Sequence, residues 1–188
     1  VSLARNNPTL AMINRRSLTD PRVTVLIDDA FIRLRKSPAT YDIIIADFPD
    51  PHDETISKLY TVEFYTIIAA RLRSGGIFVT QSTSPFFASR AFWCIHATMK
   101  GVFPSVVPYR VYIPSFGDWG FNMAAVQGPV PEVDESRAPL EGCRDFSKGA
   151  FAPSLHFAPD SIARGLDENT FNRPVLYNYY LKGWKNYV

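Results

Sequence analysis

The sequence contains little cysteine, little net charge and no long apolar run. Its two cysteines, Cys94 and Cys143, are far apart among 188 residues, which excludes a disulfide framework or a zinc site and favours a reducing compartment. No apolar run reaches the ~18 residues of a membrane span, and no signal peptide is visible. A net charge of +2, with scattered Lys and Arg, argues against nucleic acid as a partner.

Length and composition are those of an ordinary globular chain. The hydrophobic fraction is 46% and the charged fraction 20%, enough for one domain with a sizeable core. The chain begins without Met and inside a helical pattern, so we expect a fragment of a longer protein. Gly75 and Gly76 precede a strand pattern, whereas phosphate-binding glycine loops follow a strand and open a helix. The pair is therefore not interpreted as a phosphate site.

Hydrophobic periodicity predicts alternating helices and strands over residues 1–126. The predicted helices cover 2–14, 29–37, 58–73 and 89–102, and the predicted strands cover 23–27, 41–47, 74–81, 103–115 and 119–126. Uniformly apolar strands that alternate with helices indicate an α/β fold with a mostly parallel sheet covered on both faces. The last two strands, joined by a turn containing Gly117, predict an antiparallel C-terminal hairpin.

The character of the sequence changes near residue 127. Residues 127–155 are rich in Pro, Gly and charge, which predicts a loop. Two short helices are predicted within 159–166 and 174–187. Leu176, Tyr180 and Trp184 share one side of the second helix, so residues 127–188 are expected to form a C-terminal extension that docks on the domain.

Acidic residues follow two of the predicted strands. "VTVLIDDA" ends in Asp28 and Asp29, and "DIIIADFPDP" ends in Asp47 and Asp50. Ligands of open parallel sheets bind at the carboxyl ends of the strands. If the two strands are neighbours, these carboxylates converge on one crevice suited to a cationic or hydrogen-bond-donating ligand.

Simpler interpretations of these acids stay open. Asp28 or Asp29 can cap the helix that begins near Ala30, and the Asp50-Pro51 pair can be a turn.

Other candidate sites are weaker. A metal site built from the acidic cluster is disfavoured, because carboxylates packed this closely in a proline-constrained loop rarely all face inward; its members would be Asp47, Asp50, His52, Asp53 and Glu54. His96 lies in an apolar helix pattern and is interpreted as a core or edge residue, and His156 has no visible partner in the sequence.

Four segments in order carry a family resemblance over residues 1–126: "DPRVTVLIDDAF", "YDIIIADFPDP", "KLYTVEFY" and "LRSGGIFVTQ". Together they resemble the second half of the spermidine synthase (polyamine aminopropyltransferase) domain. Three further segments resemble the bacterial branch whose synthase domain follows a membrane-embedded N-terminal region: "SPFFASRAFWCIHATM", "PYRVYIPSFGDWGFNMA" and "NRPVLYNYYLKGW".

The resemblance implies a methyltransferase-like Rossmann fold and aminopropyl transfer from decarboxylated S-adenosylmethionine to putrescine or a related amine, giving spermidine and methylthioadenosine. No tightly bound cofactor or metal is implied. Asp29 and Ala30 match positions that contact the adenine, Asp47 matches the general base, and Asp47 to Asp50 match the amine-binding segment, to which we add Tyr60. The family also implies a homodimer and a cytoplasmic location, with the chain as the cytoplasmic domain of a membrane protein as one alternative.

The acidic segment suits this chemistry. An alkylammonium with a pKa of ~10.4 becomes nucleophilic only when it loses a proton. A carboxylate such as Asp47 can orient the amine and accept that proton, while Asp50 holds the other end of the cation. From their spacing, Phe48, Tyr60, Phe64 and Phe86 are expected to cover the methylene chain.

The sequence departs from the family pattern in two ways. The glycine-rich loop and the ribose-binding acid of the family would lie upstream of Val1, so we predict that this chain alone does not bind the nucleoside tightly. "HDETISK" replaces the family's P-x-G-P-A-like stretch, which leaves the preferred amine open. Two other functions stay open: an S-adenosylmethionine-dependent methyltransferase, and a non-catalytic module for polyamine binding or assembly.

Overall fold

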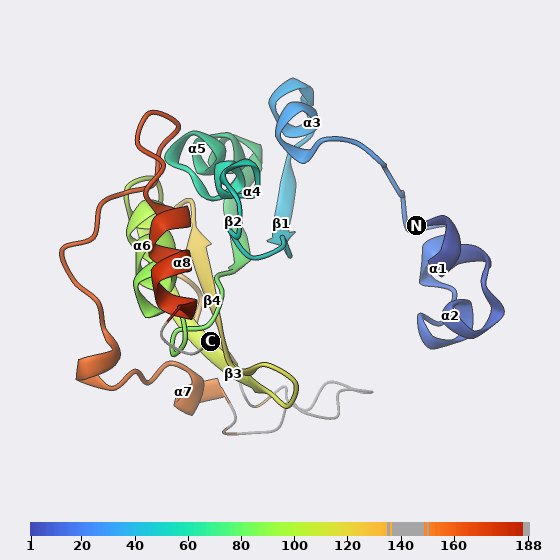
Figure 1. Ribbon diagram of the computed structural model, residues 1–188. Helices are drawn as coiled ribbons and strands as arrows, with labels where there is room; N and C mark the ends of the chain where they lie inside the picture. The colour runs from blue at the N-terminus through green and yellow to red at the C-terminus, as the bar shows by residue number, and fades with distance from the viewer. Residues whose placement is uncertain (135, 137–148, 150, 186–188) are drawn as a thin grey trace. The chain divides into compact units, whose positions relative to one another are not determined.

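The computed structural model describes residues 1–134, 136, 149 and 151–185 (Figure 1). The chain divides into two compact units, residues 1–33 and residues 34–188. In the described residues every helix is too short or too polar to span a bilayer.

The first unit is helical at its start. The helix predicted over 2–14 is split into α1 (Ser2–Asn6) and α2 (Pro8–Ile13), because a proline disfavours helical geometry in the residue before it. That residue, Asn7, is extended, and its side chain accepts a hydrogen bond of 3.1 Å from the Leu10 amide. A 3-10 turn, η1 (Ser17–Thr19), follows.

The strand predicted over residues 23–27 is wrong. The segment has no strand geometry, and Val23, Leu26 and Ile27 are 44%, 56% and 82% exposed. A β-branched sequence forms a strand only where a neighbour supplies backbone hydrogen bonds and a surface to pack on. Among the described residues no strand pairs with this segment, so its local propensity alone does not suffice. The helix α3 (Ala30–Lys36) begins three residues later.

The second unit contains a four-stranded sheet (Figure 1). Its strands are β1 (Tyr41–Ala46), β2 (Leu72–Gln81), β3 (Ser105–Ile113) and β4 (Gly117–Ala125), in the order β1-β2-β4-β3. β1 and β2 are parallel, whereas β2–β4 and β3–β4 are antiparallel. The C-terminal hairpin is confirmed. The sheet has one parallel pair and two antiparallel pairs rather than a mostly parallel arrangement.

The helices of this unit are α4 (Glu54–Ser57), η2 (Lys58–Tyr60), α5 (Val62–Arg71), α6 (Ser89–Lys100), α7 (Phe151–Ser154), η4 (Pro159–Ser161) and α8 (Leu176–Trp184). The helix predicted over 58–73 is interrupted at Thr61, which is extended and whose hydroxyl caps α5. The helix predicted over 159–166 forms only the turn η4, because Ile162 is extended and Gly165 is left-handed.

The core lies between the sheet and helices α5 and α6. Phe78 of β2 is fully buried. The centroid of its ring lies 5.7 Å from that of Tyr65 in α5 and 5.8 Å from that of Phe103. The sequence predicts that β1 is buried on both faces, but Ile43 and Ile45 are 62% and 72% exposed. Ile43 and Ile45 point to the same face of β1, and the described residues of this unit leave that face largely uncovered.

Residues 169–184 of the C-terminal segment pack against the helices. Asn169 is fully buried and its side-chain amide donates to the carbonyls of Ser57 at 3.0 Å and Tyr60 at 3.1 Å. Its side-chain oxygen accepts from the amide of Leu176, the first residue of α8, at 3.2 Å. One side chain thereby joins the start of α8 to the segment beside the acidic loop, and α8 lies alongside α6 (Figure 1).

Candidate functional site

The acidic loop follows β1 at the carboxyl end of the parallel strand pair. β1 ends at Ala46, and Asp47 and Asp50 both line a cleft of about 710 Å³. The other walls are mainly apolar and aromatic, with Val79, Tyr109, Trp119 and Phe121 among them. Two carboxylates at the end of an apolar trough suit a ligand that carries positive charge on a hydrocarbon chain.

The carboxylate of Asp50 is partly buried and held by side chains from the end of β2 and the turn after it. It accepts hydrogen bonds from Gln81 at 3.3 Å and Thr83 at 3.2 Å, and Tyr180 of α8 lies nearby. Burial raises the pKa of this carboxyl above its usual value, and Gln81, Tyr180 and Thr83 partly offset that effect. Asp47 is exposed at the mouth of the cleft. The two carboxylates thus have different surroundings.

Gln81, the last residue of β2, organises the site. Its side-chain nitrogen contacts the carbonyl of Phe48 at 2.7 Å and the hydroxyl of Tyr60 at 2.8 Å, besides Asp50. Its side-chain oxygen accepts from the Thr83 amide at 2.9 Å and the Trp119 indole at 3.2 Å. Gln81 was not among the site residues predicted from the sequence, although the rule that ligands gather at strand ends applies equally to this strand.

Thr83 reaches Asp50 from a strained backbone. Its φ is +61°, in the left-handed region that a β-branched residue rarely adopts. Two backbone hydrogen bonds hold the turn: the Gly120 amide donates to the Thr83 carbonyl and the Ser82 amide donates to the Gly120 carbonyl, each at 2.8 Å. A Cβ on Gly120 would lie 2.8 Å from the Thr83 oxygen and 2.4 Å from Phe92. Glycine is therefore required at this position.

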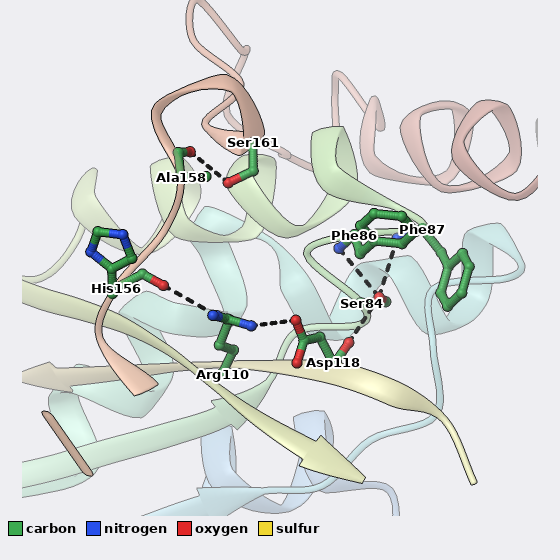
Figure 2. A network of polar contacts seen from close by, with 8 residues as sticks. All are labelled: Ser84, Phe86, Phe87, Arg110, Asp118, His156, Ala158 and Ser161. Carbon is green, nitrogen blue, oxygen red and sulfur yellow. Dashed lines mark hydrogen bonds and ion pairs between the residues drawn. The ribbon is translucent and has the colours of Figure 1, made fainter. Parts of the chain in front are cut away.

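The residues after Thr83 are anchored to the hairpin of β3 and β4 (Figure 2). The Ser84 hydroxyl donates to the Asp118 carbonyl at 2.9 Å and accepts from the Phe87 amide at 3.2 Å. The Asp118 carboxylate pairs with Arg110, which also donates to the His156 carbonyl at 3.1 Å. This network fixes the loop that carries Thr83 and Phe87, and it gives His156 a partner through its backbone.

Tyr60 is fully buried and lies behind the acidic loop. Its hydroxyl donates to the carbonyl of Pro49 at 3.0 Å. Burial raises the pKa of this phenol, and the negative charge of Asp50 raises it further. The ring of Phe48 packs edge-on against the rings of Tyr60 and Phe64, with centroid separations of 6.0 Å and 5.7 Å. Phe48 lines the cleft, whereas the other two rings support the loop from behind.

Asp29 and Ala30 lie at the start of α3. The Asp29 carboxylate accepts from the Ile32 amide at 2.9 Å, so the capping interpretation is confirmed. Asp29 belongs to the first unit and Asp47 to the second. Their meeting in one crevice, and the contact of Asp29 and Ala30 with adenine, stay predictions.

Asp53 and His96, two other residues considered from the sequence, make contacts within the fold. Asp53 caps α4 by accepting from the Ile56 amide at 2.7 Å, and the described residues contain no group of three or more His, Cys, Asp or Glu side chains arranged to hold a metal. His96 contacts the Asn122 side chain at 2.7 Å, and burial lowers its pKa. His96 is half-buried at the edge of the core, one of the two positions that the sequence interpretation allowed.

Comparison with known proteins gives consistent results. Residues 6–137 match the family described as "Spermine/spermidine synthase domain". Polyamine aminopropyltransferase 2 of Ralstonia nicotianae is 36% identical over 187 residues, which cover 97% of this chain and 36% of that protein. The polyamine aminopropyltransferase of Mycobacterium tuberculosis is 36% identical over 189 residues, covering 98% of this chain and 35% of the relative. The chain thus spans about a third of the length of these relatives.

Two solved structures share the fold. A spermidine synthase in complex with the transition-state analogue AdoDATO superposes with a TM-score of 0.67 and 21% identity, covering 81% of this chain and 56% of that one. The spermidine synthase of Thermotoga maritima gives a TM-score of 0.60 and 19% identity, covering 81% and 54%. The predicted α/β fold of the methyltransferase-like class is confirmed. With a family match over most of its length, the chain belongs to the spermine/spermidine synthase family.

Proposed function

We propose that the complete protein transfers the aminopropyl group of decarboxylated S-adenosylmethionine to putrescine or a related amine. The observation that supports it is the pair Asp47 and Asp50 at the carboxyl end of β1, both lining one apolar cleft, in a chain of this family. Relatives named polyamine aminopropyltransferase align over nearly the whole chain.

The step is a displacement at carbon. The amine nitrogen forms a bond to the propyl carbon next to the sulfonium, and the carbon–sulfur bond breaks with its electrons moving to sulfur. Methylthioadenosine leaves, and the attacking amine gives up a proton to the Asp47 carboxylate, which is open to the cleft, as the carbon–nitrogen bond forms. Asp50, held by Gln81 and Thr83, attracts the other end of the cation and aligns it.

The nucleoside is proposed to contact Asp29 and Ala30, and Tyr60 acts as the support of the amine-binding loop. The same proposal includes a homodimer and a cytoplasmic location beside an N-terminal membrane region, which rest on the family branch. Light scattering of the complete protein tests the dimer, and a single-subunit mass would refute it.

Product mass tests the function. The complete protein is incubated with putrescine and either decarboxylated S-adenosylmethionine or S-adenosylmethionine, and the products are weighed. An aminopropyl increment supports the proposal, whereas a methyl increment would assign a methyltransferase. Absence of both, with no methylthioadenosine binding by calorimetry, would assign a non-catalytic module.

A further inference from the structure

A chain of hydrogen bonds runs from helix α6 to the turn that holds Asp50. The Nδ1 atom of His96 lies 2.7 Å from the side-chain oxygen of Asn122. Because that oxygen only accepts, the ring donates through Nδ1. The Asn122 amide donates to the Ser82 hydroxyl at 3.0 Å, and Ser82 donates to the Thr80 carbonyl at 3.2 Å. Each group therefore donates to the next, an arrangement in which hydrogen bonds strengthen one another.

The middle of this chain is closed to water. Asn122 and Ser82 are fully buried, so bulk solvent cannot replace a partner that either of them loses. His96 is half-buried, and its ring meets that of Trp93 edge-on, with 5.4 Å between the two centroids. The imidazole is thus held by a ring contact and by the hydrogen bond to Asn122.

Ser82 lies between the two residues that hold the Asp50 carboxylate. Gln81 and Thr83 donate to that carboxylate at 3.3 Å and 3.2 Å. The backbone of Thr83 is strained, with a φ of +61°, and such a conformation persists only where its surroundings fix it. The amide and the hydroxyl of Ser82 both bond to residues of β4. Side-chain bonds therefore fix the turn in addition to backbone bonds.

We propose that His96 is a positioning residue for the amine site, acting through Asn122 and Ser82 on the turn that holds Asp50. The inference rests on the proposed function. The described residues that line the cleft beside Asp50 do not include His96, so its effect is indirect. The ring N–H keeps the Asn122 amide in one orientation, because a flipped amide would set its own N–H groups against that donor. The amide nitrogen then stays directed at Ser82.

The test compares transfer to putrescine by variants of the complete protein. His96→Phe keeps a ring beside Trp93 and removes the donor. The value of kcat/KM for putrescine is expected to fall roughly 10-fold, less than the roughly 100-fold cost of a 1 Å misplacement, because backbone bonds still hold the turn. His96→Asn returns an N–H donor close to the Nδ1 position and should recover most of this loss. The matched control is Ser89→Ala, on the same helix, which loses only a hydrogen bond to the Ser161 carbonyl and should stay near the wild type.

The Michaelis constants separate positioning from a loss of folded protein. A variant that is only less stable lowers kcat through its active fraction and leaves both Michaelis constants unchanged. Positioning of Asp50 predicts a higher KM for putrescine and an unchanged KM for decarboxylated S-adenosylmethionine. Ser82→Ala breaks the same chain and should give the same change, and combining it with His96→Phe should add little to either variant alone. Equal losses for His96→Phe and His96→Asn, or fully additive losses in the double variant, would overturn the proposal.

Calorimetric titration with putrescine separates this proposal from the proposed function. Transfer by the wild type, with an unchanged KM for putrescine in His96→Phe, refutes the positioning role and leaves the function intact. Putrescine binding that weakens in His96→Phe, without any transfer by the wild type, supports the positioning role and refutes the function. Absence of both binding and transfer in the wild type refutes both.

Discussion

Replacing Gly120 by Ala tests whether the strained turn at Thr83 depends on the backbone of β4. The added methyl group would lie 2.4 Å from Phe92 Cε2 and 2.8 Å from the Thr83 carbonyl oxygen. Phe92 is fully buried, and its ring is packed against Trp93 at 5.1 Å and Phe157 at 5.5 Å. The ring cannot move aside without displacing these neighbours.

Overpacking of this kind costs about 1–3 kcal/mol. The loss of glycine's extra freedom in the unfolded chain returns about 0.5–1 kcal/mol, so a net destabilisation of about 1 kcal/mol is expected. For a chain of this size that lowers Tm by roughly 2–4 °C. The displaced Thr83 carbonyl also moves the hydroxyl that holds Asp50, so kcat/KM for the amine is expected to fall.

Gly101→Ala is the matched control. Gly101 has a φ of −68°, which alanine adopts freely, and its added Cβ would meet only the end of the exposed Glu168 side chain. Thermal unfolding by circular dichroism should show this variant within roughly 1 °C of the wild type. A Tm for Gly120→Ala equal to that of the control would refute the assignment of Gly120 as the support of the turn.

Three further predictions concern stability. Burial raises the pKa of Asp50, so the folded state binds the proton more tightly; the free energy of unfolding should fall as pH rises above 3.8, and urea titrations of Asp50→Asn should lack that fall. Burial lowers the pKa of His96, so stability should decrease as pH drops below 6.5, and His96→Gln should show a flatter profile; an unchanged profile would contradict the burial. Asn169→Ala leaves the carbonyls of Ser57 and Tyr60 without their donor and is expected to cost about 2–5 kcal/mol, whereas a loss below about 1 kcal/mol in urea unfolding would show that water replaces the amide.

The sequence correctly predicts the strands whose pairing partners are present in the same unit. β2 and the hairpin of β3 and β4 form where periodicity places them, because their partners are present in the same unit. The segment at 23–27 has an equally apolar pattern and stays exposed, since pairing depends on a neighbour that the pattern does not specify.

In the candidate site, too, some residues are predicted by the sequence pattern and others depend on contacts that the pattern does not specify. Asp47 and Asp50 follow from the rule of strand ends, and Gln81 is found by applying that rule to one more strand. Tyr180 contacts Asp50 from a helix far along the chain, and only its place on the docking side of that helix is readable from the pattern. Thr83 depends on a left-handed backbone, which its residue type argues against.

The central claim is that Asp47 accepts the proton of the attacking amine. The rate of aminopropyl transfer by a variant that lacks this carboxylate tests the claim most directly. Single-turnover transfer to putrescine by the complete protein is compared for Asp47→Asn and for Asp53→Asn. The second variant keeps the cap of α4, because Asn caps a helix as well as Asp. The account predicts a rate roughly 10²- to 10⁴-fold lower for Asp47→Asn and a rate near the wild type for Asp53→Asn. Equal rates for the two variants would contradict it.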